Sequence, residues 1–131
     1  MLRPAGLRVH HLALRVGDPE ASLAFYSGVL GLPEIRRFEE DGRVRSIWVR
    51  AGECVLMLER EIRGSGPGAG SGHVLVLEVG ALGDWIARLE AAGRPPLDRT
   101  AATAFFADPD GHRVGLTVFP REGMLDPDRP A

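Results

Sequence analysis

The first half of the chain contains four side chains that could bind a ligand or take part in a reaction: His11, Arg15, Trp48 and Glu59. Each lies in a segment with the alternating pattern of a strand, in which residues an even number apart point to the same side. An imidazole can bind a proton or a metal, a guanidinium an anion, an indole a planar ring, and a carboxylate a hydrogen-bond donor. If these segments form one sheet, the residues make a polar and aromatic ligand site.

The same alternation adds apolar and small residues to this face, and it leaves some roles open. We expect the pocket to be lined by His11, Arg15, Trp48, Met57, Glu59 and Gly115, with Ala13, Ser46, Val55 and Thr117 beside them. Trp48 either stacks on a ligand or only packs, and Arg15 either holds an anionic group or stays solvated at the rim. Cys54 falls on the opposite, apolar face and is expected to be an inert buried thiol.

Residues 9–32 and 74–93 each have the pattern of a strand, a turn and a helix, and the two stretches align without a gap when Val16 is laid on Val79. A repeat of this length predicts two similar modules. Asp18 and Pro19 are typical of a helix N-terminus, and a glycine at position 31 is typical of its end. The second helix is expected to begin near Leu82.

Segments with strand character complete each module. In the first they span residues 34–40, 43–50 and 53–60, separated by the turn dipeptides Asp41-Gly42 and Ala51-Gly52. In the second, residues 103–107 and 113–119 flank the turn Asp108-Pro109-Asp110-Gly111, and Pro95 and Pro96 make the segment that follows them a poor central strand.

The sequence therefore predicts an α+β protein of two βαβββ modules, whose curved mixed sheets form a shared cleft with the helices outside. The first module is expected at residues 7–61 and the second at 73–120. A glycine-rich linker is predicted at 62–72, and a flexible C-terminal tail at 121–131.

Composition excludes several classes of partner. The net charge is −2, without a polybasic segment, which argues against nucleic acid as a partner. No apolar run approaches the length of a membrane span, so we expect no membrane association. The N-terminus lacks the apolar core of a signal peptide and the single cysteine cannot form an internal disulfide, so a cytoplasmic location is expected.

The motif HHLALRVGDPEASLAFYSGVLGL, together with the late FFADPDGHRVGLTVFP, resembles the vicinal oxygen chelate superfamily of glyoxalases, bleomycin-resistance proteins and extradiol dioxygenases. The resemblance extends over residues 9–120. It implies a fold shared by metalloenzymes and by metal-free binding proteins.

In the metal-dependent members each module supplies two ligands, and the corresponding positions here are His11, Met57, Val74 and Gly115. Only the first is a metal ligand by type. We therefore expect no cofactor. The alternative is a divalent Zn, Ni, Mn or Fe ion held by His11, Glu59 and His73, which requires a β-bulge that turns His73 inward.

The favoured hypothesis is a glyoxalase/bleomycin-resistance-like protein that binds a small, partly hydrophobic molecule in the cleft between the modules. The alternative is a metal-dependent lyase, isomerase or dioxygenase of the same superfamily, for which the sequence identifies no catalytic residue. A homodimer is expected in either case, because open four-stranded sheets have unpaired edges.

Overall fold

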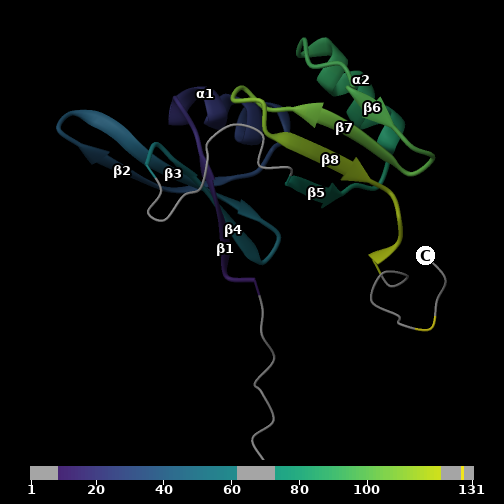
Figure 1. Cartoon of the computed structure of the whole chain (residues 1–131), viewed down its shortest axis with the longest axis horizontal. Helices are drawn as coiled ribbons and strands as arrows, with labels where there is room; N and C mark the ends of the chain where they lie inside the picture. The colour runs from purple at the N-terminus through teal and green to yellow at the C-terminus, as the bar shows by residue number, and fades with distance from the viewer. Residues whose placement is uncertain (1–8, 62–72, 122–127, 129–131) are drawn as a thin grey trace, which may run out of the picture. The chain divides into compact units, whose positions relative to one another are not determined.

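The structure, a computed structural model, describes residues 9–61, 73–121 and 128 (Figure 1). The chain divides into two compact units, residues 1–68 and 69–131, and each is described by itself. The linker predicted at 62–72 and most of the predicted tail lie outside the described residues. In the part of the chain that is described, no helix is long and apolar enough to cross a membrane.

Unit 1 has the predicted order of strand, helix and three strands. Its elements are β1 (His11–Arg15), α1 (Pro19–Leu23), the π-helix η1 (Ala24–Val29), β2 (Glu34–Glu40), β3 (Arg43–Ala51) and β4 (Cys54–Glu59). The strands form one sheet in the order β1-β4-β3-β2. Only β1 and β4 are parallel, so the sheet is mixed.

Unit 2 repeats this plan. Its elements are β5 (Val74–Glu78), α2 (Leu82–Ala91), β6 (Asp98–Arg99), β7 (Thr103–Ala107) and β8 (Arg113–Thr117). The sheet order is β5-β8-β7-β6, with β5 parallel to β8. The predicted pair of βαβββ modules with mixed sheets is thus confirmed. The segment after Pro95 and Pro96 contributes only the two-residue edge strand β6, because proline cannot supply the backbone donor that an interior strand needs.

The first helix begins as predicted but changes type along its length. Asp18 caps it by accepting a hydrogen bond from the backbone amide of Glu20 at 3.0 Å, and Pro19 takes the first position. The expected continuous α-helix ends at Leu23 and gives way to the π-helix. The wider π turn brings two successive aromatic rings, Phe25 and Tyr26, into the core, where they meet edge to face with centroids 5.0 Å apart.

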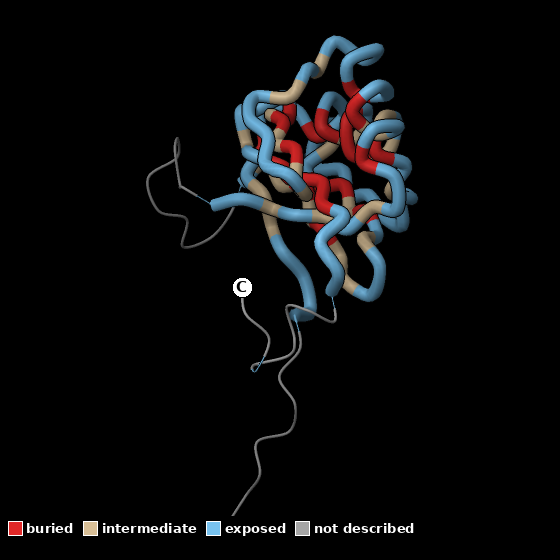
Figure 2. Tube along the Cα trace, turned by 90° about the vertical axis from the view of Figure 1, so that its right-hand side faces the viewer, coloured by how far each residue is buried: buried red, intermediate tan, exposed pale blue. Residues whose placement is uncertain are grey.

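Each helix packs against one face of its own sheet. In unit 1, α1 contacts β3 and β4, and in unit 2, α2 contacts β7 and β8. The buried strand residues beneath α1 are Ile47, Val49, Leu56 and Leu58. The corresponding residues of unit 2 are Ala104, Phe106, Val114 and Leu116. Most of the buried stretches in Figure 2 lie within strands and helices.

The turn between β7 and β8 is fixed by one buried carboxylate. Asp108 accepts hydrogen bonds from the backbone amides of Asp110 and His112 at 2.9 and 2.7 Å. Gly111 adopts a φ of 84°, which favours glycine. Asp108 is therefore accounted for by turn structure.

Candidate functional site: a groove on the open face of unit 1

Strand pairing in unit 1 brings the predicted side chains together in rows across the sheet. Ser46 on β3 pairs with Glu59 on β4, which in turn pairs with Arg15 on β1. The next row contains Trp48, Met57 and Ala13, and the row beyond it contains Arg50, Val55 and His11. These rows lie on one face because they are two residues apart along each strand, and the leucines of β4 take the opposite, helix-covered face.

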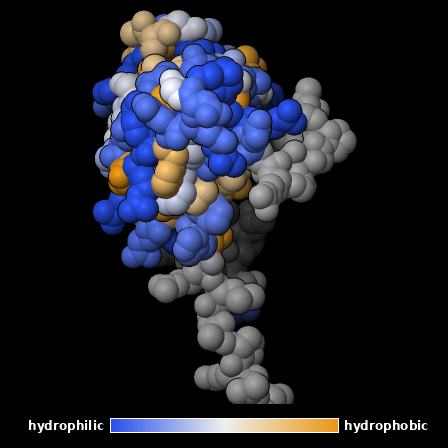
Figure 3. Space-filling model, turned by 90° about the vertical axis from the view of Figure 1, so that its left-hand side faces the viewer, coloured by the Kyte–Doolittle hydropathy of each residue, from blue (hydrophilic) through white to orange (hydrophobic). Residues whose placement is uncertain are grey.

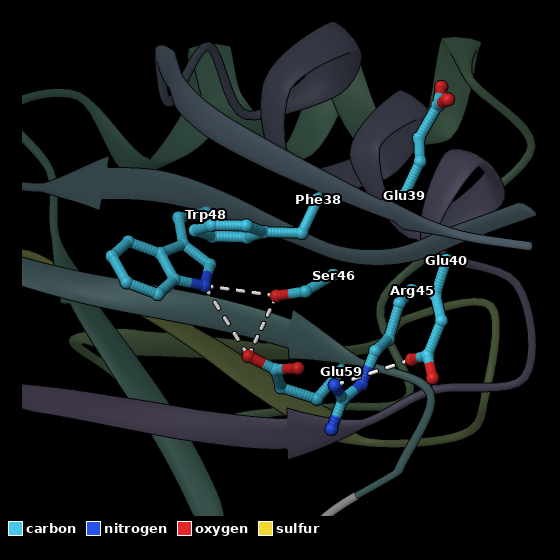
Figure 4. A pocket seen from close by; sticks show the side chains of 7 residues that line it. All are labelled: Phe38, Glu39, Glu40, Arg45, Ser46, Trp48 and Glu59. Carbon is cyan, nitrogen blue, oxygen red and sulfur yellow. Dashed lines mark hydrogen bonds and ion pairs between the residues drawn. The ribbon is translucent and has the colours of Figure 1, made fainter.

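A groove of about 420 Å³ lies on this open face (Figure 4). Its lining residues are Phe38, Glu39, Glu40, Arg45, Ser46, Trp48 and Glu59. Two of the predicted pocket residues, Trp48 and Glu59, line the groove. His11, Arg15 and Met57 share the sheet face without lining the groove, and Gly115 belongs to unit 2.

A three-way hydrogen-bond network fixes the carboxylate of Glu59. Its Oε1 accepts a hydrogen bond from Ser46 Oγ at 2.7 Å and a longer one from Trp48 Nε1 at 3.3 Å. The same indole N–H donates to Ser46 Oγ at 2.9 Å. Ser46 is buried, and the other two side chains are half-buried. Figure 4 shows that the second carboxylate oxygen of Glu59 takes no part in this network.

Trp48 and Phe38 form an aromatic wall beside this carboxylate. Their ring centroids lie 5.2 Å apart with a tilt of 57°. The Arg36 guanidinium lies 5.7 Å from the centre of the indole, a cation–π contact that adds to the positioning of the ring. The groove thus combines flat apolar surface with a hydrogen-bond acceptor at the edge of the indole.

A β-bulge supplies the charged end of the groove. Phe38 on β2 pairs with Ser46, but the next residue, Glu39, pairs with Val44, so Arg45 is the extra residue of β3. An extra residue disturbs the alternation of side chains and re-aims them. Strict alternation from Ser46 would send Arg45 to the helix side, and yet its side chain lines the groove.

The guanidinium of Arg45 forms an ion pair with Glu40 at 3.3 Å at the end of the groove, and Figure 4 shows the side chain of Glu39 pointing away. Sequence reasoning missed Phe38, Glu39, Glu40 and Arg45 as groove residues. The Asp41-Gly42 turn was a usable signal, because it predicted the hairpin that places β2 beside β3.

The residues at the family's four ligand positions do not fit a divalent metal. Only His11 offers a nitrogen or oxygen, whereas Met57, Val74 and Gly115 do not. A Cβ atom on Gly115 would lie 3.1 Å from the Val76 side chain and 3.2 Å from the Phe105 ring, so these neighbours would have to shift to admit a ligand side chain there.

The alternative ligand set is not assembled within unit 1 either. His11 pairs with Val55 and Arg15 pairs with Glu59, so His11 and Glu59 lie four residues apart along the strands, roughly 13 Å. His73 is exposed and precedes β5, whose pairing runs regularly from Val74 to Glu78 without a bulge. Among the described residues, no group of three His, Cys, Asp or Glu side chains is placed to hold a metal ion.

Each unit is thus a four-stranded mixed sheet with a helix packed on one face, the plan of a βαβββ protein. The chain belongs to the Glyoxalase/Bleomycin resistance protein/Dioxygenase superfamily, whose family model matches residues 8–116. No curated protein matches the sequence.

Similar solved structures include both binding proteins and enzymes. TnmS3, an antibiotic binding protein from Streptomyces sp. CB03234, superposes with a TM-score of 0.69 at 23% identity, covering 88% of this chain and 98% of its own. Lactoylglutathione lyase from Agrobacterium tumefaciens gives 0.67 at 20%, covering 88% and 95%. An integron cassette protein from the mobile metagenome of V. cholerae gives 0.70 at 21%, covering 91% and 100%. These likenesses show a shared fold, which by itself selects no activity.

Proposed function

We propose that this protein binds a small, partly aromatic molecule in the groove of unit 1, and that it does so without a metal ion. The observation that carries the proposal is the aromatic pair of Trp48 and Phe38 beside the fixed carboxylate of Glu59. An apolar surface with a few oriented polar groups is the usual composition of a small-molecule site. A volume of about 420 Å³ suits a ligand of two or three fused rings.

Binding, rather than catalysis, is what the polar groups support. Glu59 Oε1 already accepts two hydrogen bonds from neutral donors that hold the carboxylate in one orientation. A fixed acceptor of this kind orients a ligand, and a metal would need ligands that the family positions no longer provide. That TnmS3 is an antibiotic binding protein supports the idea that this fold can serve sequestration.

The groove can be tested by titrating ¹⁵N-labelled protein with planar aromatic probes such as naphthalene derivatives. The indole N–H of Trp48 is a direct reporter because it lies within the network, and Trp85→Phe assigns its signal, since the chain has two tryptophans. We expect saturable shifts of the Trp48 signal, and a loss of binding of about tenfold or more in Trp48→Ala.

Trp85 provides a matched control, because it lies on α2 of unit 2 and is also half-buried. Trp85→Ala is expected to leave the affinity of the probes unchanged. If the probes shift residues elsewhere and not Trp48, Phe38 or Glu59, the groove is not the binding site.

We also propose that the protein forms a homodimer. The edge strands are β1 and β2 in one unit and β5 and β6 in the other, and among the described residues each pairs with a strand on one side only. Exposed strand edges favour association with another chain. Light scattering at micromolar concentration is expected to give twice the mass of the chain, and a monomeric mass would contradict the proposal.

A further inference from the structure

The position of Glu59 relative to Trp48 determines what a bound ring can carry. The carboxylate lies at the nitrogen edge of the indole, 3.3 Å from Nε1. A ring that lies against the indole therefore brings its own edge next to this carboxylate. A substituent on that edge meets an oxygen that can only accept hydrogen bonds.

Two of the other charged groups of the groove, Arg45 and Glu40, are paired with each other. Arg45 is joined to Glu40 at 3.3 Å, which makes that end of the groove an ion pair. Arg15 is exposed and pairs in register with Glu59, and none of the ion pairs given for the described residues includes Glu59. Glu59 is thus held by the neutral donors Ser46 and Trp48.

We infer that Glu59 makes the groove selective for planar aromatic ligands that carry a hydrogen-bond donor at the ring edge, above all a protonated amine. This inference rests on the proposed function and deepens it by naming the ligand class. A charge-assisted hydrogen bond to a carboxylate is stronger than a neutral one. A ligand without a donor would cover the carboxylate and displace its hydrating water without offering a hydrogen bond in return. The carboxylate would then be left unsatisfied, which weakens binding.

A set of probes with the same ring isolates this effect. The cation is 2-naphthylmethylamine, the neutral donor is 2-naphthylmethanol, the ligand without a donor is 2-(methoxymethyl)naphthalene, and the anion is 2-naphthoate. Titrations followed at the Trp48 indole signal should rank the amine first, the alcohol second, and the ether and the carboxylate last. We expect the amine to bind about tenfold more tightly than the ether.

Glu59→Gln should remove this ranking. Glutamine keeps the size of the side chain and an oxygen for Ser46 and Trp48, but it loses the charge. The amine should lose about tenfold in affinity, while the ether should change by less than about twofold. A dispersed amide spectrum of the variant checks that it is folded.

Glu39→Gln is the matched control. It removes the same charge from a residue that borders the groove but points away from it. We expect this variant to keep the full preference for the amine. An equal loss in both variants would overturn the role of Glu59 and assign the preference to the overall charge of the groove.

The results separate this inference from the proposed function. If all four probes bind to Trp48 with similar affinity, or if the naphthoate binds best, the groove is a ligand site but Glu59 does not select a donor. If Glu59→Gln keeps the preference for the amine, the selectivity again lies elsewhere. If no probe shifts the Trp48 signal, both the inference and the proposed function are overturned.

Discussion

The two units share a backbone plan but not a chemistry. In unit 1 the amide of Val16 donates to the carbonyl of Glu59 at 2.8 Å, and in unit 2 the amide of Val79 donates to the carbonyl of Thr117 at the same distance. Strand pairing then matches the open faces residue by residue. The row of Ser46, Glu59 and Arg15 corresponds to Thr103, Thr117 and Glu78, and the row of Trp48, Met57 and Ala13 corresponds to Phe105, Gly115 and Val76.

The two threonines of the polar row in unit 2 are satisfied within the protein. The hydroxyls of Thr103 and Thr117 lie 2.8 Å apart, much as Ser46 and Glu59 do in unit 1. The Thr117 hydroxyl also donates to the carbonyl of Ala102 and accepts from the amide of Phe119. In unit 1 the same position is a carboxylate, which has oxygen to spare for a ligand.

The aromatic row differs in a similar way. The ring of Phe105 packs over Gly115, close enough to fill the space of a side chain there. Trp48 instead pairs with a methionine and turns its indole N–H into the groove network. One βαβββ plan can thus present a packed face or a grooved face, depending on a few outward residues. The face of the molecule drawn in Figure 3 is mostly hydrophilic, with scattered apolar residues among those described.

The largest effects are expected where the two units are alike, in their cores. Leu58 and Leu116 occupy corresponding positions beneath the helices and are 0% and 1% exposed. Leu58→Ala and Leu116→Ala should each lower the free energy of unfolding by roughly 2 to 5 kcal/mol in a denaturant melt. A loss below about 0.5 kcal/mol in either variant would mean that the strand faces are assigned the wrong way round.

The next effect tests where the units differ. Gly115→Glu restores a carboxylate at a family ligand position, but its Cβ would press against Phe105 and Val76. We expect it to lower the unfolding free energy by about 1 to 3 kcal/mol, the usual cost of overpacking. Met57→Glu is the matched change in unit 1, where a half-buried side chain already occupies the space, so it should cost less. Equal costs would show that the Phe105 packing does not distinguish the units.

Much of the fold followed from local sequence signals. The strand 103–107 has the predicted bounds because β-branched and aromatic residues there are followed by a strong turn. The N-terminal cap at Asp18 and the β2–β3 hairpin around Asp41-Gly42 were likewise encoded in short motifs. Alternation then assigned Trp48 and Glu59 to one face, which pairing confirms.

The missed features arise from departures from ideal periodicity. The π-helix inserts an extra residue into a helical turn, and the bulge at Arg45 inserts one into a strand, so neither follows from a constant period. The contact between Phe105 and Gly115 joins two strands and depends on packing that only the folded chain reveals. The bulge adds Arg45 to the groove of unit 1. The contact with Phe105 narrows the space at Gly115, a family ligand position in unit 2.

A smaller effect concerns β2, the seven-residue edge strand of unit 1 whose counterpart β6 has only two residues. Arg37 on β2 forms ion pairs with Glu34 at 2.7 Å and with Glu20 of α1 at 2.6 Å. The hydrogen bond from Arg37 lowers the pKa of Glu34 below its ordinary value of 4.5, and the carboxylates raise the pKa of the guanidinium.

Because the folded-state pKa of Glu34 is depressed, its contribution to stability is present above pH 4.5 and is lost as the pH falls through the folded value. The denaturation midpoint of Glu34→Gln should therefore lie slightly below that of the parent at neutral pH and converge with it in acid. Glu39→Gln serves as the control. A difference between Glu34→Gln and the parent that stays constant between about pH 6 and pH 3 would contradict the pairing with Arg37.

The smallest effect is expected for metal addition, and it bears on both units at once. The alternative ligand set needs His11 and Glu59 from unit 1 and His73 from unit 2, so a bound ion would require both units to supply ligands. A single imidazole binds divalent ions weakly. Protein purified without a histidine tag and dialysed should therefore carry less than about a tenth of an equivalent of Zn, Ni, Mn or Fe.

Stoichiometric metal that is lost in His11→Ala and also in Glu59→Ala would instead favour a metal-dependent lyase, isomerase or dioxygenase. If His73→Ala also released that metal, the second unit would supply a ligand from the segment before β5, and the contrast between the grooved face of unit 1 and the packed face of unit 2 would no longer hold.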